Sequence, residues 1–122
     1  MQSYPATYDT LKQVVEDAAK ILGIPTPELK IKDVRRGVAN YRGGWVSVPR
    51  WAVERGFAYA AYYVIHEVTH HHPDAFGHGP TFKHLEAHVL AEFGMTIKRR
   101  RVYAKRLHAL SGPVLYSDAD AK

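Results

Sequence analysis

The chain of 122 residues contains no cysteine. Disulfide bonds and thiolate metal sites are therefore excluded, and any metal ion must be held by histidine or carboxylate side chains. No stretch reaches the roughly 20 consecutive apolar residues that a membrane-spanning helix requires, and the polar first residues lack the basic and apolar regions of a secretory signal. We therefore expect an intracellular, cytoplasmic protein with no membrane partner.

The composition is that of one folded domain. Hydrophobic residues make up 46% and charged residues 24% of the chain, which is ordinary for a globular protein rather than a disordered one. We find no internal repeat and expect a single domain over residues 1–122, with 111–122 as a flexible tail because its structural signals are weak. The net charge of +5 favours contact with acidic surfaces such as nucleic acid.

Hydrophobic periodicity predicts an α+β domain. Apolar residues recur at helical spacing over 7–22, 57–71 and 80–93, two or three short antiparallel strands are expected over 29–48, and the basic segment 95–103 has the pattern of a strand. The expected architecture is thus an N-terminal helix, a small antiparallel sheet, two further helices and a terminal basic strand.

The second of these helices contains the sequence His66-Glu67-Val68-Thr69-His70. At 100° per residue, His70 lies 40° around the helix from His66 and one turn along it, so both imidazoles can reach one ion. Glu67 lies on the same side, near enough to take a proton from a metal-activated water. The apolar residues of the helix fall on the opposite face: Phe57, Ala61, Val64, Ile65 and Val68. This division predicts one wall for the core and one for metal chemistry.

A catalytic zinc site needs three protein ligands and one open position. His78 is our preferred third ligand, because its glycine-flanked loop lets the chain turn back over the helix. Glu86 is the alternative, either as a ligand or as a group that orients a zinc-bound imidazole. The neighbouring histidines are expected to be solvated surface residues: His71, His72, His84 and His88.

The two motifs together resemble a known family. HExxH at His66–His70, followed by Gly77-His78-Gly79-Pro80-Thr81-Phe82-Lys83, is similar to the SprT-like metallopeptidases, which include the Spartan DNA–protein crosslink proteases. Gly94-Met95-Thr96-Ile97 also resembles the family's transition from helix to strand, and the similarity covers about Tyr59 to Tyr103. The resemblance implies a minimal zincin-like fold, one Zn²⁺ per chain and His78 as the third ligand.

The chain also departs from related patterns. SprT-like proteins often carry a cysteine zinc ribbon, which a chain without cysteine cannot form. The metzincin spacing HExxHxxGxxH is not met either, because Pro73 and Phe76 occupy its glycine and histidine positions. The resemblance therefore supports the catalytic core more than any particular substrate.

These features predict a zinc metallopeptidase that hydrolyses peptide bonds of a protein or peptide substrate and acts on DNA-associated proteins if the family resemblance extends that far. Glu67 is the expected general base, taking a proton from the activated water and passing it to the leaving amine. Zincin folds commonly pair the substrate backbone with an edge strand, and residues 45–48 are our prediction for that strand. Trp45 and Trp51 are expected in the core rather than in the cleft.

Six cations lie within nine residues near the end of the chain: Lys98, Arg99, Arg100, Arg101, Lys105 and Arg106. They predict either a nucleic-acid contact through phosphates or a charged edge strand that discourages aggregation. The competing function is a non-catalytic, zinc-stabilised nucleic-acid-binding module, against which Glu67 argues because a structural site needs no base. A histidine-metal nuclease of the HNH kind is disfavoured, since its ligands lie on a ββα hairpin rather than on one helix.

Overall fold

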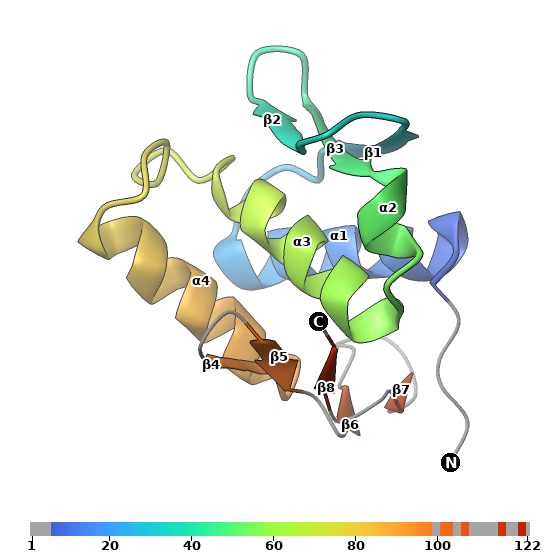
Figure 1. Ribbon diagram of the computed structural model, residues 1–122. Helices are drawn as coiled ribbons and strands as arrows, with labels where there is room; N and C mark the ends of the chain where they lie inside the picture. Colours follow the sequence, from blue (N-terminus) through green and yellow to red (C-terminus); the bar gives the residue numbers. More distant parts are fainter. Residues whose placement is uncertain (1–5, 99–100, 104–105, 108–114, 117–119, 122) are drawn as a thin grey trace.

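The structure is a computed structural model that describes residues 6–98, 101–103, 106–107, 115–116 and 120–121 (Figure 1). Its helices are α1 (Tyr8–Leu22), α2 (Arg50–Val53), α3 (Phe57–Thr69) and α4 (Pro80–Glu92). Its main strands are β1 (Glu28–Lys32), β2 (Val38–Asn40) and β3 (Trp45–Pro49). Short strands follow towards the end: β4 (Thr96–Lys98), β5 (Arg101–Tyr103), β6 (Arg106–Leu107), β7 (Leu115–Tyr116) and β8 (Asp120–Ala121). The expected α+β class is confirmed.

Local sequence signals explain where α1 begins and ends. The Thr7 side chain accepts a hydrogen bond from the Thr10 backbone N–H, and the Thr10 side chain in turn accepts one from the Thr7 backbone N–H, which satisfies two amides that the first turn leaves free. Gly23 ends the helix in a left-handed conformation with φ 68°, which glycine adopts without a Cβ clash. The capped helix can then bury one apolar face against α3.

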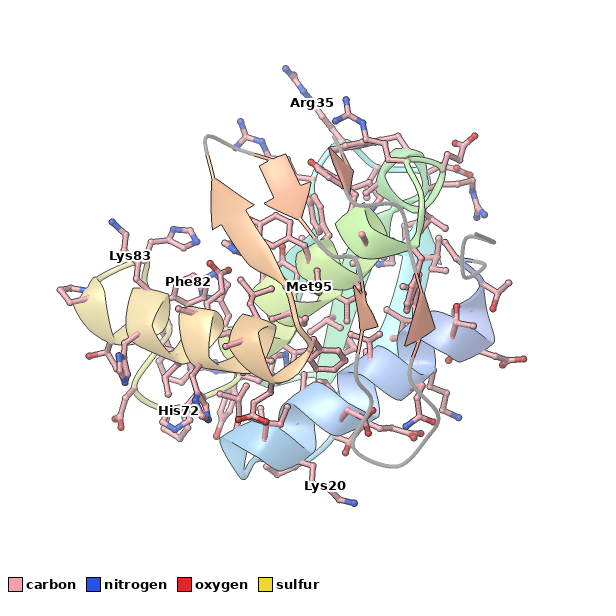
Figure 2. All side chains as sticks on the ribbon, turned by 90° about the horizontal axis from the view of Figure 1, so that it is seen from below. Lys20, Arg35, His72, Phe82, Lys83 and Met95 are labelled. Carbon is pink, nitrogen blue, oxygen red and sulfur yellow. The ribbon has the colours of Figure 1, made fainter. Side chains whose placement is uncertain are left out.

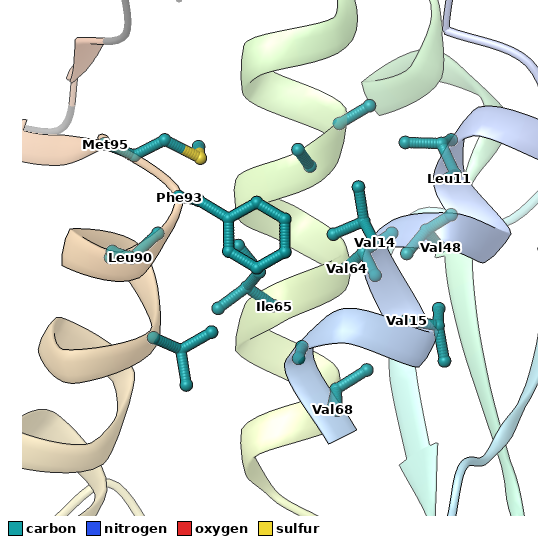
Figure 3. Close-up of a cluster of buried hydrophobic side chains, with 14 of the residues drawn as sticks. Leu11, Val14, Val15, Val48, Val64, Ile65, Val68, Leu90, Phe93 and Met95 are labelled. Carbon is teal, nitrogen blue, oxygen red and sulfur yellow. The ribbon is translucent and has the colours of Figure 1, made fainter. Parts of the chain in front are cut away.

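Helix α3 lies at the centre of the domain, between α1 and α4 (Figure 1). Figure 3 shows Val14 of α1 beside Val64 of α3, and Phe93 at the end of α4 beside Ile65 on the other side of α3. Full burial of such side chains stabilises the fold by about 1.5–3 kcal/mol each. In contrast, Lys20 and Lys83 extend outwards at the periphery (Figure 2). The core thus fixes α3, and with it the residues on its polar face.

The sheet corrects two predictions. Its strand order is β1-β3-β2, with β1 and β3 parallel and β2 and β3 antiparallel, so the sheet is mixed rather than antiparallel. The strand that contains Trp45–Val48 is central, not an edge. Both faces of β3 are covered, because Ser47 is buried along with Val46 and Val48. The edge strand beside His66 and Glu67 is β2, because Gly37 and Ala39 line the same cleft as these two residues.

The end of the chain also differs from the single basic strand that the sequence predicts. Residues Thr96–Lys98 and Arg101–Tyr103 form two antiparallel strands, β4 and β5, and β8 pairs with β5. Strands β6 and β7 form a separate pair. Two of these strands, β7 and β8, fall within 111–122, where a flexible tail was expected; the other residues of that stretch lie outside the described residues. None of the described helices is long and apolar enough to cross a membrane.

Candidate metal centre

Helix α3 presents His66, Glu67 and His70 on the side away from the core. Val64, Ile65 and Val68 on its other side are fully buried, which fixes how the helix is rotated. His70 is the first residue after the helix and keeps helical backbone angles of φ −63° and ψ −15°. Its side chain therefore stays one turn above His66, as the helical spacing predicts.

The loop between α3 and α4 returns His78 to this face. Its turns are held by backbone hydrogen bonds, including Ala75 N–H to the His72 carbonyl at 3.0 Å, and Pro80 starts α4 at a position where a missing N–H is tolerated. The Nε2 atom of His78 lies 2.9 Å from Nε2 of His70 and 3.3 Å from Nε2 of His66. The sequence-predicted histidines are thus brought together.

The geometry and the donor chemistry of the three imidazoles fit a single metal ion. Each of His66, His70 and His78 offers one nitrogen, and these atoms all lie within 4.8 Å of one another. Tetrahedral zinc with Zn–N bonds of about 2.0–2.1 Å places its ligand nitrogens about 3.3–3.4 Å apart. The distance of 3.3 Å between His66 and His78 matches this spacing, and the 2.9 Å between His70 and His78 is a little shorter.

Hydrogen bonds orient two of the rings. Nδ1 of His66 lies 2.6 Å from Oε2 of Glu86, and Nδ1 of His70 lies 3.0 Å from the carbonyl oxygen of Ala75. Because an ionised carboxylate and a carbonyl only accept, both rings donate from Nδ1, and in the neutral tautomer the lone pair is then on Nε2, facing the cluster. Glu86 therefore lies behind His66 and outside the three-histidine cluster. This is the position of an orienting group, one of the two roles that the sequence predicted for Glu86.

Phe82 of α4 forms the apolar backing of the cluster, a position that the motif alone did not reveal. Its ring stacks on His70 with centroids 4.3 Å apart and meets the rings of His66 and His78 at 4.9 and 5.1 Å. It is only 3% exposed. Burial lowers the pKa of the His70 imidazole, and repulsion from His66 and His78 acts in the same direction against the Ala75 hydrogen bond. Burial therefore favours the neutral, metal-binding form of His70.

Glu67 is buried at the edge of this cluster. Its desolvation raises the pKa of the carboxyl group above the ordinary value, and the Glu86 carboxylate adds to this effect while His66 opposes it. A carboxylate with a raised pKa holds a transferred proton more readily, which suits a general base that later acts as an acid. Glu67 and the three histidines line one side of a common cleft.

The cleft has a volume of about 430 Å³. Gly37 and Ala39 line it from the edge of the sheet, and Tyr41 and Phe76 lie at its mouth. Gly37 is held in place by a 3.0 Å hydrogen bond from its backbone N–H to the hydroxyl of Tyr63. A site of this size admits a few residues of a bound chain beside the histidines.

No family model, curated protein or solved structure matches the chain. The similarity to SprT-like metallopeptidases therefore rests on the two linked motifs and remains an expectation. What the structure adds is the position of these motifs: the loop between them brings His78 to the same cleft as His66, Glu67 and His70.

Other predicted residues lie apart from the cluster. His84 and His88 are exposed on α4, as expected. His71 was expected to be solvated, but it is 5% exposed and its Nε2 donates to the Trp45 carbonyl at 3.1 Å. His71 is buried, contrary to the expectation, because the turn after α3 points its ring towards the sheet.

The tryptophans belong neither to the core nor to the cleft beside the three histidines. Trp51 is 39% exposed and donates from its indole N–H to the Arg35 carbonyl at 3.0 Å. Trp45 lies under the ammonium groups of Lys30 and Lys32, at 4.5 and 4.4 Å. The expectation that both belong to the core is therefore wrong, because both lie at the surface of the sheet and of α2.

The basic segment lies only partly within the described residues. Lys98 ends β4, Arg101 begins β5 and Arg106 begins β6. Arg99, Arg100 and Lys105 lie outside the described residues. The expected nucleic-acid contact of this segment remains a prediction.

Proposed function

We propose that the chain is a zinc metallopeptidase that hydrolyses peptide bonds, with His66, His70 and His78 as the zinc ligands. The observation that carries this proposal is the convergence of three imidazole nitrogens beside a buried carboxylate in an open cleft. Three protein ligands with room for a fourth are typical of catalytic zinc, whereas structural sites are closed by four protein ligands. Among the described residues no fourth side chain joins the cluster.

Zinc bound to these residues would supply Lewis-acid activation of water and of the scissile carbonyl. Glu67 supports this chemistry as the proton carrier: it accepts a proton from the attacking water and delivers it to the leaving amine. Glu86 and the Ala75 carbonyl keep the rings of His66 and His70 in the tautomer that leaves Nε2 free. Phe82 excludes water from the back of the cluster.

Strand β2 is our assignment for the surface that aligns the substrate backbone. It ends the sheet order β1-β3-β2, so its outer edge is unpaired among the described strands. Gly37 and Ala39 place this edge along the metal cleft. An extended peptide that pairs with β2 would lie over Glu67 with its backbone held by hydrogen bonds.

The buried Glu67 favours this proposal over a non-catalytic nucleic-acid-binding module. Among the described residues Glu67 takes part in no salt bridge. Burying such a carboxylate is unfavourable, and a zinc site that only stabilises the fold gains nothing from it. The net charge of +5 keeps a contact with nucleic acid open to test, and DNA-associated proteins are the substrates if the family resemblance extends that far.

The test compares wild-type protein with Glu67→Gln. We expect about one zinc per chain in both by elemental analysis, because Glu67 is not a ligand. Hydrolysis of unfolded protein substrates should fall by about 10²–10⁴-fold in Glu67→Gln, and the assay is run with and without DNA. If both proteins hold zinc and hydrolysis is absent from both or equal in both, the peptidase proposal is rejected. Stimulation of wild-type hydrolysis by DNA would support DNA-associated proteins as substrates.

A further inference from the structure

Two aromatic residues at the mouth of the cleft are unusually exposed. Phe76 is 59% and Tyr41 is 54% exposed, the highest values among the large hydrophobic side chains of the described residues. Their rings meet edge to face with centroids 5.2 Å apart, and both line the cleft that contains Glu67. A single exposed aromatic residue needs no explanation, but a pair of them at the mouth of a cleft is typical of a binding surface.

The two rings come from different walls of the cleft. Tyr41 follows the edge strand β2 and packs against His71 at 5.8 Å, and His71 is itself fixed to the Trp45 carbonyl at 3.1 Å. Phe76 directly follows Ala75, whose carbonyl accepts the hydrogen bond from His70. Each ring is therefore attached to the framework that positions the proposed metal ligands, which favours a preformed surface.

The residues that line the cleft from β2 and the following turn alternate in the chain and increase in size. Gly37, Ala39 and Tyr41 are two residues apart and all line the cleft. For Gly37 and Ala39 this follows the period of two of an extended chain, and Tyr41 continues it from the turn after β2. At Gly37 an added Cβ would lie 2.8 Å from Oε2 of Glu67, so the space beside the base must remain free of side chains. The cleft is thus narrow and polar beside Glu67 and apolar at the end formed by Tyr41 and Phe76.

We propose that Tyr41 and Phe76 form an apolar subsite that binds one large apolar side chain, aromatic or Leu/Met, close to the scissile bond of the substrate. This inference rests on the proposed peptidase function and names its substrate class: extended segments that expose large apolar side chains, as unfolded proteins do. An inserted side chain packs against both rings and covers surface that is exposed in the free protein. The subsite is continuous with β2, so one bound strand reaches both.

The first experiment measures binding rather than cleavage. Zinc-loaded Glu67→Gln is titrated into two fluorescent peptides that differ only by Phe or Ala at one position, and affinity is measured by anisotropy. We expect the Phe peptide to bind about 3- to 10-fold more tightly, the size expected of one aromatic contact. Adding Phe76→Ala should abolish the preference, Phe76→Leu should keep most of it, and Tyr8→Ala, which removes an exposed aromatic residue on α1, should leave it unchanged.

Zinc content and thermal unfolding are measured for every variant, so that a misfolded protein is recognised. A preference that survives in the Tyr41→Ala/Phe76→Ala double variant, or no preference in the parent protein, would overturn the subsite. If the preference depends on Phe76 while wild-type protein cleaves neither peptide, the subsite stands and the peptidase proposal fails. If wild-type protein cleaves both peptides at equal rates, the peptidase stands and the subsite fails.

Discussion

The Glu86 carboxylate lies 2.6 Å from Nδ1 of His66, on the opposite side of the ring from the three-histidine cluster. Glu86 comes from α4 and His66 from α3, so one hydrogen bond ties the proposed metal site to the packing of the two helices. The hydrogen bond also fixes the tautomer and the orientation of the imidazole, which strengthens its bond to a metal.

We predict that Glu86→Ala weakens zinc affinity by about 10- to 100-fold, the range found when such orienting groups are removed. The zinc affinity of Glu86→Gln should lie between those of the wild type and Glu86→Ala, since glutamine keeps an acceptor but loses the charge. Affinity is measured by competition with a chromophoric chelator, and Glu92→Ala, an exposed glutamate at the end of the same helix, is the control. Zinc affinity that is equal in Glu86→Ala and Glu92→Ala would show that the hydrogen bond does not orient the ligand.

The identity of the third ligand is tested separately. His78→Ala should lose stoichiometric zinc, because two imidazoles on one helix leave the ion with half of its tetrahedral ligands. His84→Ala removes an exposed histidine from α4 and should retain zinc fully. Retention of zinc by His78→Ala together with its loss in Glu86→Ala would instead make Glu86 the ligand.

Gly37 is predicted to be intolerant of any side chain. A Cβ at this position would lie 2.5 Å from Cε1 of Tyr63 and 2.7 Å from the Ser47 carbonyl oxygen, and the second of these atoms is backbone that cannot move aside easily. Overpacking of this kind destabilises a protein by about 1–3 kcal/mol. We therefore expect Gly37→Ala to lower the free energy of unfolding by that amount.

Peptide hydrolysis by Gly37→Ala should fall as well, because the substitution crowds Glu67 and displaces the edge strand. Denaturant titration and the hydrolysis assay are applied to the same preparation. Gly77→Ala is the matched control, since a Cβ there would meet no atom within 4 Å. Equal stability of the two variants would mean that Gly37 does not lie as close to Tyr63 and Ser47 as these distances indicate.

The helices could be predicted from the sequence because their signals are local. The apolar positions of α3, the proline at the start of α4 and the glycine after α1 each act within a few residues. His66, Glu67 and His70 could be identified for the same reason. Placing His78 beside them required a loop closure, which the flanking glycines and the resemblance of the second motif suggested but which no local helical spacing specifies.

The sheet could not be predicted in the same way. Alternation in residues 45–48 indicates a strand, but it does not specify which strands are its partners or in which direction they run. The parallel pairing of Leu29 with Val46 therefore became apparent only in the structure. The environment of His71 could not be predicted either, because the carbonyl that accepts the hydrogen bond from its ring belongs to Trp45, a residue 26 positions away.

The buried His71 should make the stability of the protein depend on pH. Burial lowers the pKa of its imidazole below the ordinary value of 6.5, against the opposing effect of the hydrogen bond to Trp45. Below that ordinary value the unfolded chain binds a proton that folded His71 resists, so the free energy of unfolding should fall as the pH falls from about 6.5 towards the folded pKa. Above 6.5 this contribution is fully present and does not change.

The measurement is denaturant unfolding of metal-free protein between about pH 7 and about pH 5, which keeps zinc out of the comparison. His71→Gln should be less stable than wild type near pH 7, by about 1 kcal/mol for a weakened hydrogen bond, yet it should lose less stability on acidification. His70 titrates in both proteins, so its contribution cancels in the difference. Parallel pH profiles for the two proteins would mean that His71 is as free to bind a proton in the folded state as in the unfolded chain.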